Sequence, residues 1–189
     1  MLDPLDKSGE KNEKIDDIHQ LAINQTFKKV GIQNVECLLD YGCGVGRNYD
    51  FLSSKCQQYV GVDISFGMIK NAKGKVFQID GINLPFQNNV FSLIYSFWVL
   101  QHVVEDNILD DILSEFNRCL KADGIVIICE RSSRESRFEP GKNKEYINRR
   151  NPISYIEQFF EHGMVCFYAM PIKSYSLSKK AYLKPVISG

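Results

Sequence analysis

Hydrophobic residues in the middle of the chain form short runs that alternate with amphipathic stretches. Five runs have the length of a strand and lie at residues 36–41, 59–62, 75–79, 91–96 and 124–129. Apolar residues at helical spacing fill three of the intervals, at residues 46–54, 66–73 and 105–120. Strands that alternate with helices predict an α/β domain with a doubly wound parallel sheet. The runs are almost continuously apolar, which is typical of strands covered on both faces.

The two ends of the chain have different patterns. Residues 1–14 are polar and lack sustained periodicity, so we expect a mobile arm before a single domain at residues 15–189. Apolar spacings of three and four predict a helix from Ile15 that ends near Gly31.

Beyond the fifth run, residues 131–151 form a polar connection and residues 152–161 are predicted to be helical. Two further strands are predicted at residues 164–169 and 175–183. The short link between them allows only antiparallel pairing.

The segment from Leu38 to Asn48 runs from a strand into three glycines at alternate positions, Gly42, Gly44 and Gly46. Glycines at such a turn permit a positive φ angle and a close approach of the backbone to a ligand. The dinucleotide pattern G-x-G-x-x-G would place Arg47 at its third glycine, and Asp40 would repel a pyrophosphate. These residues therefore favour a nucleotide-type site for a cationic ligand over a nicotinamide-dependent oxidoreductase.

Asp40-x-Gly42-x-Gly44-x-Gly46 resembles motif I of the class I S-adenosylmethionine-dependent methyltransferases. Gly61-Val-Asp63-Ile-Ser65, Gln78-Ile-Asp80-Gly81 and Leu84-Pro-Phe86 resemble later motifs of this family, and the resemblance spans residues 36–130. It implies a mostly parallel seven-stranded sheet of order 3-2-1-4-5-7-6, with the last strand antiparallel and helices on both faces.

The resemblance also implies the cofactor S-adenosylmethionine, which gives up its methyl group by direct displacement and leaves S-adenosylhomocysteine. Asp40 and the three glycines would hold the methionine part, Asp63 the ribose and Asp80 the adenine. Other residues expected to line the cofactor site, with core packing as the alternative for the apolar ones, are Ile64, Met68, Gly81 and Phe97.

Residues after the fourth strand are candidates for contact with the methyl acceptor. His102 could act as a general base near neutral pH or hold a loop by hydrogen bonds. Trp98 and Gln101 are placed to touch substrate, and core packing is the alternative for Trp98.

The connection at residues 131–150 is locally basic, and it suggests either an acceptor with a phosphate or carboxylate, bound by Arg134 and Arg149, or a solvated loop. An acceptor of small-molecule, glycan-precursor or chain-terminal type is expected.

The overall composition narrows the class of protein. Lys plus Arg (23) equals Asp plus Glu (23), which argues against a nucleic-acid partner. The alternative of an RNA methyltransferase is disfavoured because the sequence shows neither an appended RNA-binding module nor a strongly basic chain. Six scattered cysteines without a C-x-x-C pair argue against a metal site and suggest a reducing cytoplasm. No apolar run is long enough to span a membrane. A catalytically inactive cofactor-binding partner subunit remains the alternative function.

Overall fold

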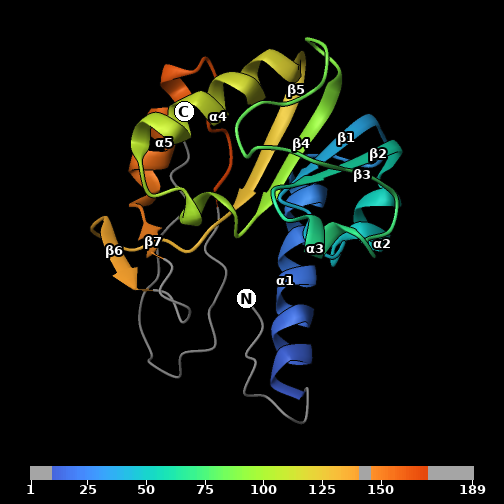
Figure 1. Ribbon diagram of the computed structural model, residues 1–189, viewed down its shortest axis with the longest axis horizontal. Coiled ribbons are helices and arrows are strands. Elements are labelled where there is room, and N and C mark those ends of the chain that lie inside the picture. The colour runs from blue at the N-terminus through green and yellow to red at the C-terminus, as the bar shows by residue number, and fades with distance from the viewer. Residues whose placement is uncertain (1–9, 141–145, 170–189) are drawn as a thin grey trace. The chain divides into compact units, whose positions relative to one another are not determined.

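The computed structural model describes residues 10–140 and 146–169 (Figure 1). Contacts between residues group 34–165 into one compact unit, which contains the sheet, whereas residues 10–33 and 166–169 belong to a second unit. Among the described helices, none is both long and apolar enough to cross a membrane.

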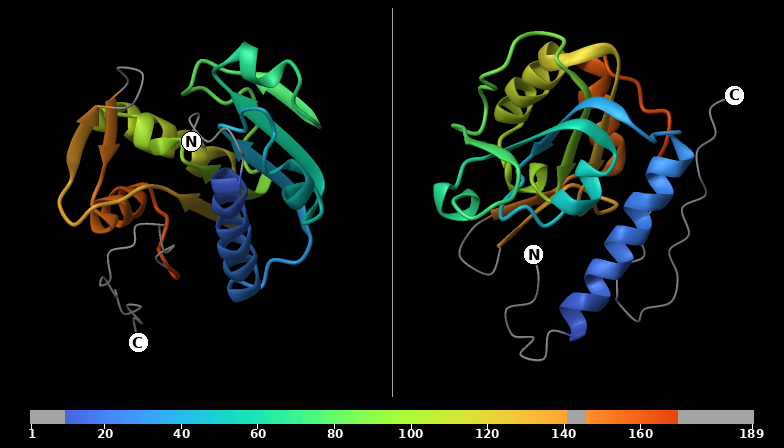
Figure 2. Two further views of the ribbon diagram at one scale, coloured as in Figure 1. Left: turned by 90° about the horizontal axis from the view of Figure 1, so that it is seen from below. Right: turned by 90° about the vertical axis from the view of Figure 1, so that its right-hand side faces the viewer.

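A five-stranded parallel sheet forms the centre of the first unit, in the order β3-β2-β1-β4-β5 (Figures 1 and 2). Its strands are β1 (Val35–Tyr41), β2 (Cys56–Asp63), β3 (Lys75–Gln78), β4 (Phe91–Phe97) and β5 (Leu120–Cys129). The middle of β1 and of β4 is buried, as the continuous apolar runs predicted. The predicted doubly wound α/β class and the order of the first five strands are confirmed.

Helices lie on both sides of this sheet (Figures 1 and 2). They are α2 (Tyr49–Ser53) and α3 (Phe66–Ile69) on one side, α4 (Asp106–Cys119) and α5 (Pro152–Glu161) on the other, and the short 3-10 helix η1 (Leu100–His102) after β4. The apolar face of α4 supplies Leu109, Leu113 and Phe116 to the core. The side chain of Asn151 begins α5 by accepting a hydrogen bond from the backbone N–H of Ile153 at 2.9 Å.

Helix α1 (Glu10–Lys29) belongs to the second unit. It begins before the predicted start at Ile15, so residues 10–14 are helical. Residues 1–9 of the predicted arm lie outside the described residues.

The prediction for the end of the chain was partly wrong. The polar connection contains a two-stranded antiparallel hairpin, β6 (Arg137–Pro140) and β7 (Tyr146–Arg149), which the apolar pattern did not indicate because each strand has only four residues and mixes apolar with polar side chains. Residues 164–169 form no strand, and Val165 and Phe167 are exposed. The strand predicted at residues 175–183 lies outside the described residues, so the last two positions of the predicted order are not confirmed.

Three predicted boundaries also moved. Helix α2 begins at Tyr49 because the glycines up to Gly46 adopt left-handed conformations that a helix cannot include. Helix α3 ends at Ile69, and turns lead to Gly74. Strand β5 begins at Leu120, because Leu120 pairs with Phe91 before an irregularity in the register.

Candidate cofactor and acceptor site

A loop of left-handed glycines follows β1 at the carboxyl edge of the sheet. Gly42, Gly44 and Gly46 have φ angles of +76°, +54° and +78°. A Cβ atom on Gly42 would lie 2.2 Å from a methyl carbon of Val99, so this position accepts only glycine without a shift. The predicted tight turn is present, and its backbone N–H groups at Gly42 and Cys43 bind the Val62 carbonyl at 2.8 and 3.0 Å.

Asp63, the last residue of β2, holds the glycine loop in place. One of its carboxylate oxygens accepts a hydrogen bond from the Gly44 N–H at 2.8 Å, and the other accepts one from the Ser65 N–H at 2.8 Å. Each carboxylate oxygen can accept a further hydrogen bond. The carboxylate therefore lies against the loop and keeps capacity for a ligand hydroxyl.

Asp40 lies beneath the loop and is only 3% exposed. The Tyr59 hydroxyl donates a hydrogen bond to it at 2.8 Å. Burial raises the pKa of Asp40 to about 7, the Tyr59 hydroxyl opposes this shift, and the nearby charge of Asp63 adds to it. The sequence singled out Asp40 but did not reveal Tyr59 as its partner, because β1 and β2 meet only in the folded sheet.

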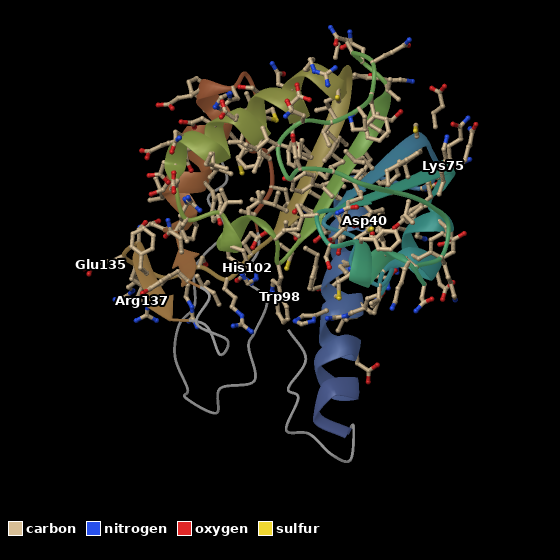
Figure 3. The ribbon with its side chains drawn as sticks, in the orientation of Figure 1. Asp40, Lys75, Trp98, His102, Glu135 and Arg137 are labelled. Carbon is tan, nitrogen blue, oxygen red and sulfur yellow. The ribbon has the colours of Figure 1, made fainter. Side chains whose placement is uncertain are left out.

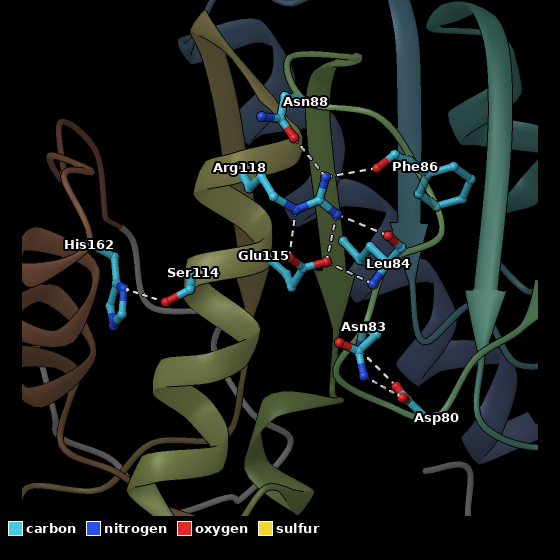
Figure 4. Close-up of polar contacts among 9 residues, drawn as sticks. All are labelled: Asp80, Asn83, Leu84, Phe86, Asn88, Ser114, Glu115, Arg118 and His162. Carbon is cyan, nitrogen blue, oxygen red and sulfur yellow. Dashed lines mark hydrogen bonds and ion pairs between the residues drawn. The ribbon is translucent and has the colours of Figure 1, made fainter.

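Asp80 is exposed and closes a turn after β3 (Figure 4). Its carboxylate accepts hydrogen bonds from the backbone N–H groups of Ile82 and Asn83 at 2.9 and 2.8 Å, and from the Asn83 side chain at 2.5 Å. The hydrogen bonds from the Asn83 side chain and from these backbone groups lower the pKa of Asp80. Gly81, with a φ of +100°, accepts a hydrogen bond from the Tyr41 hydroxyl. Asp80 thus closes a loop and does not cap a helix.

The segment after this turn is fastened to helix α4 (Figure 4). Arg118 donates hydrogen bonds to the carbonyls of Leu84 and Phe86 at 2.9 and 2.8 Å. Glu115 pairs with Arg118 at 2.6 Å and accepts a hydrogen bond from the Leu84 N–H at 2.8 Å. The sequence did not reveal this role of Arg118.

Two apolar side chains near the carboxyl end of β2 are exposed, Ile64 by 64% and Met68 by 46%. The alternative that they are plain core residues is therefore wrong. The Met68 methyl carbon lies 3.6 Å from the position of a Cβ on Gly44, and Ile64 lies 3.1 Å from that of a Cβ on Gly81. Fold geometry thus brings the glycine loop, the end of β2 and the Asp80 turn together around apolar surface.

Aromatic rings and guanidinium groups gather at the end of β4. The Phe97 and Trp98 rings have centroids 5.2 Å apart. The Arg47 guanidinium carbon lies 5.4 Å from the Phe97 centroid and 5.9 Å from the Trp98 centroid, and that of Arg131 lies 4.9 Å from Trp98. Both rings are partly exposed, so Trp98 is not a core residue.

The two residues of η1 that were predicted to contact the acceptor, Gln101 and His102, come shortly after Trp98 in the chain. His102 is exposed and lies near Trp98 at the carboxyl edge (Figure 3), and its Nε2 is 3.4 Å from the Gln101 side-chain nitrogen. The Gln101 side chain is buried, and its carbonyl oxygen has no hydrogen-bond partner among the described residues. The buried Tyr95 hydroxyl and Ser96 hydroxyl share this property. Unpaired buried polar atoms at one edge are compatible with a polar ligand.

Glu130 is a site residue that the sequence did not reveal. Its carboxylate accepts hydrogen bonds from three consecutive backbone N–H groups, those of Val99 (3.0 Å), Leu100 (2.8 Å) and Gln101 (3.1 Å). Desolvation raises its pKa to about 7 against the lowering effect of these bonds. Glu130 fixes the start of η1 and thereby the positions of Trp98 and His102.

The arginines of the basic connection have separate roles. Arg150 is buried, donates to Asp106 at 2.8 Å and to the Leu100 carbonyl at 3.3 Å, and fastens the hairpin to η1 and α4. Arg149 is half-buried on β7, opposite Arg137 on β6. Arg134 is exposed in the loop before β6, where its carbonyl accepts a hydrogen bond from the Asn151 side chain. Among the residues that the structure describes, no cluster could hold a metal ion.

Comparison with known proteins relates this chain to methyltransferases. Residues 39–128 match a family described as a methyltransferase domain. The fold resembles the YcgJ protein from Bacillus subtilis, with a TM-score of 0.63 and 17% identity over 76% of this chain and 68% of that chain. It also resembles the PH0226 protein from Pyrococcus horikoshii, with a TM-score of 0.63 and 18% identity over 80% and 82% of the two chains.

Several relatives are named for their methyl acceptors. A tRNA (carboxymethyluridine(34)-5-O)-methyltransferase of Arabidopsis thaliana is 34% identical over 48% of this chain and 23% of the relative. An 18S rRNA (guanine-N(7))-methyltransferase of Bos taurus is 33% identical over 40% of this chain and 29% of the relative. Phosphoethanolamine N-methyltransferase 3 of Arabidopsis thaliana is 28% identical over 65% of this chain and 26% of the relative.

These relatives correct one prediction. Two of them act on tRNA and rRNA, so the inference from balanced charge that no nucleic acid is involved was wrong, because total charge does not report a local basic surface. The chain spans less than a third of the length of these three relatives. The motifs of the chain and the order of its five parallel strands agree with the matched methyltransferase domain. Residues 39–128, a little under half of the chain, thus match the methyltransferase-domain family, which supports the resemblance to the class I S-adenosylmethionine-dependent methyltransferases.

Proposed function

We propose that this protein transfers the methyl group of S-adenosylmethionine to a nucleophilic acceptor. The observation that carries the proposal is the loop of three left-handed glycines, which Asp63 fastens to the end of β2. The residues of this site suit the cofactor. The loop exposes backbone, Asp63 can accept a further hydrogen bond, and Ile64 and Met68 offer apolar surface for an adenine ring.

The residues of this edge divide the cofactor between them in the proposal. The glycine loop and Asp40 hold the methionine part, whose ammonium group would lower the pKa of Asp40 and keep it ionised. Asp63 accepts hydrogen bonds from the ribose hydroxyls. Asp80 and Gly81 shape the turn that meets the adenine amino group.

The acceptor binds at the ends of β4 and β5 in this proposal. Bound S-adenosylmethionine supplies a methyl group on a positively charged sulfur. Phe97 and the residues of η1 orient the nucleophile and exclude water from it, a proximity effect that can reach about 7–11 kcal/mol. His102, exposed beside Gln101, accepts a proton where the acceptor is protonated at working pH.

The named relatives support a wider acceptor set than the small molecules, glycan precursors and chain termini expected from sequence. They methylate tRNA, rRNA and phosphoethanolamine. All three share one feature, an anionic phosphate in or beside the acceptor, which is consistent with arginines at this end of the sheet.

Calorimetric titration with S-adenosylmethionine, S-adenosylhomocysteine and NAD tests the proposal. We expect the two adenosyl ligands to bind and NAD to bind far more weakly. Asp63→Ala should weaken binding at least tenfold, because the N–H groups of Gly44 in the glycine loop and of Ser65 after β2 both lose their acceptor and the ribose loses its partner. Asp50→Ala is the matched control, since Asp50 is an exposed carboxylate paired with Lys73.

Incorporation of labelled methyl groups into RNA and into small-molecule extracts separates an enzyme from an inactive binding subunit. Cofactor binding without transfer to any fraction would favour the inactive subunit. A preference for NAD over the adenosyl ligands would overturn the proposal.

A further inference from the structure

Trp98 stands at the centre of a surface built from three loops. Two guanidinium groups lie over its ring, Arg131 from the loop after β5 at 4.9 Å and Arg47 from the loop after β1 at 5.9 Å. Phe97 lies beside it at 5.2 Å. Planar guanidinium groups and aromatic rings both stack on flat π systems, so this arrangement offers a stacking platform with positive charge.

The backbone holds Trp98 in an unusual conformation. Its φ is +60°, in the left-handed region that residues other than glycine rarely adopt. Its N–H donates to the Cys129 carbonyl at 2.8 Å, and Glu130 binds the next backbone N–H groups, beginning with that of Val99. A conformation that costs free energy and is fixed from both sides keeps the ring at one place on the surface.

Positive charge continues onto the hairpin. Arg137 and Arg149 are directly opposite each other in the β6–β7 register, so the hairpin carries two guanidinium groups at this position. The hairpin is fastened to the segment after Trp98, because the Asn148 side chain binds the Val104 carbonyl at 3.3 Å. Figure 3 shows Arg137, His102 and Trp98 at the same end of the molecule, whereas Lys75 lies at the other end. Glu135 is the one acidic residue between Arg131 and Arg137.

We propose that this surface binds the methyl acceptor as a nucleotide of a single-stranded nucleic acid. The base stacks against Trp98, and neighbouring phosphates contact Arg131, Arg137 and Arg149. Aromatic rings that receive unstacked bases, next to arginines that follow the backbone, are the general means by which proteins hold single strands. The inference rests on the proposed methyl transfer for the identity of the bound strand as acceptor.

Intrinsic fluorescence reports the stacking directly, because Trp98 is the single tryptophan of the chain. The full chain, saturated with S-adenosylhomocysteine, is titrated with a short oligoribonucleotide, the same sequence in DNA, and inorganic polyphosphate. We expect both oligonucleotides to quench the fluorescence, whereas polyphosphate binds the arginines without quenching it. Stronger binding of one oligonucleotide identifies RNA or DNA as the source of the strand.

Variants resolve the two parts of the surface, with anisotropy of a labelled oligonucleotide as the readout. Trp98→Gly should weaken binding about tenfold or more, and Trp98→Phe should restore most of it because a ring remains. Glycine is chosen because it accepts the positive φ at this position. Arg137→Ala should weaken binding and reduce its salt dependence, whereas Lys75→Ala removes one charge at the other edge of the sheet and should leave both unchanged.

Failure of this inference can be distinguished from failure of the proposed function. Wild-type protein that binds S-adenosylhomocysteine but no oligonucleotide would overturn the inference alone. Polyphosphate that quenches as strongly as RNA, or Trp98→Gly that binds RNA as tightly as wild type, would also overturn it. Oligonucleotide binding without any binding of S-adenosylhomocysteine would instead overturn the proposed function. Calorimetry of Trp98→Gly with S-adenosylhomocysteine confirms that the variant is folded.

Discussion

The two halves of the carboxyl edge of the sheet differ in charge. The half at β1–β3 carries three carboxylates, Asp40, Asp63 and Asp80, and the glycine loop. The half at β4 and β5, with the hairpin, carries aromatic rings and the arginines 131, 137 and 149. A cationic cofactor and an anionic acceptor of the kind proposed above would therefore meet opposite environments, and each would be disfavoured in the place of the other.

The halves are also held in place differently. In the acidic half, backbone N–H groups of the loops donate directly to the carboxylates that face the site, such as Asp63. In the basic half, an acid and a base that do not belong to the stacking surface provide the support, namely Glu130 beneath η1 and Arg150 beneath the hairpin. A substitution at Asp63 therefore removes a site residue and a support of the loop together. A substitution at Trp98 or Arg137 leaves the supporting residues Glu130 and Arg150 in place.

The largest expected effect breaks the acidic half at its glycine loop. Gly42→Ala should lower the free energy of unfolding by about 2–5 kcal/mol, the sum of a left-handed alanine and the clash with Val99. Gly163→Ala is the matched control, since Gly163 has a φ of +78° and open space around it, and should cost only about 1–2 kcal/mol. Urea unfolding measures both variants, and equal losses would contradict the packing argument.

A smaller effect is expected where helix α4 supports the Asp80 turn. Arg118→Leu should lower the free energy of unfolding by about 1–3 kcal/mol, because the Leu84 and Phe86 carbonyls lose a charged donor. Affinity for S-adenosylhomocysteine should fall as well. The exposed pair Lys121 and Glu36 provides the control, and Lys121→Ala should cost about 0–1 kcal/mol. Unchanged cofactor affinity in Arg118→Leu would show that this support does not reach the site.

Asp40 tests the buried acid by its dependence on pH. Its pKa lies near 7 in the folded protein and near 4 when unfolded, so the folded state binds the extra proton between these values. Stability should therefore decrease as pH rises from about 4 to 7, and Asp40→Asn should flatten this decrease by roughly 1–2 kcal/mol. The same variant should bind S-adenosylmethionine more weakly at pH 8. Denaturant unfolding at pH 5 and pH 8 measures the slope, and parallel profiles would count against a raised pKa.

The smallest effect concerns Asp80. The lowered pKa of Asp80 means that its ionised carboxylate stabilises the turn, so Asp80→Asn should lower the unfolding midpoint at pH 7 slightly. Affinity for S-adenosylhomocysteine should fall by about 2- to 10-fold, the effect of one hydrogen bond. Calorimetry on the variant decides the matter, and wild-type affinity would assign Asp80 a purely local role in its turn.

The sequence predicted the acidic half better than the basic half. Apolar runs and the glycines at 42, 44 and 46 are local signals, and they predicted the strands β1–β5 and the loop after β1, whereas the order of the strands came from the family resemblance. Glu130 and Arg150 could not be found in this way, because their partners are 29 or more residues away and meet them only in the fold. Hairpin β6–β7 was missed because each of its strands has only four residues and mixes apolar with polar side chains.

Hydrogen–deuterium exchange of the full chain with and without S-adenosylhomocysteine tests the division of the site most directly. The account predicts that the ligand slows exchange at residues 42–46, 63–66 and 80–83 and leaves the hairpin at 137–140 and 146–149 unchanged. Protection confined to the hairpin, or none in the glycine loop, would contradict it.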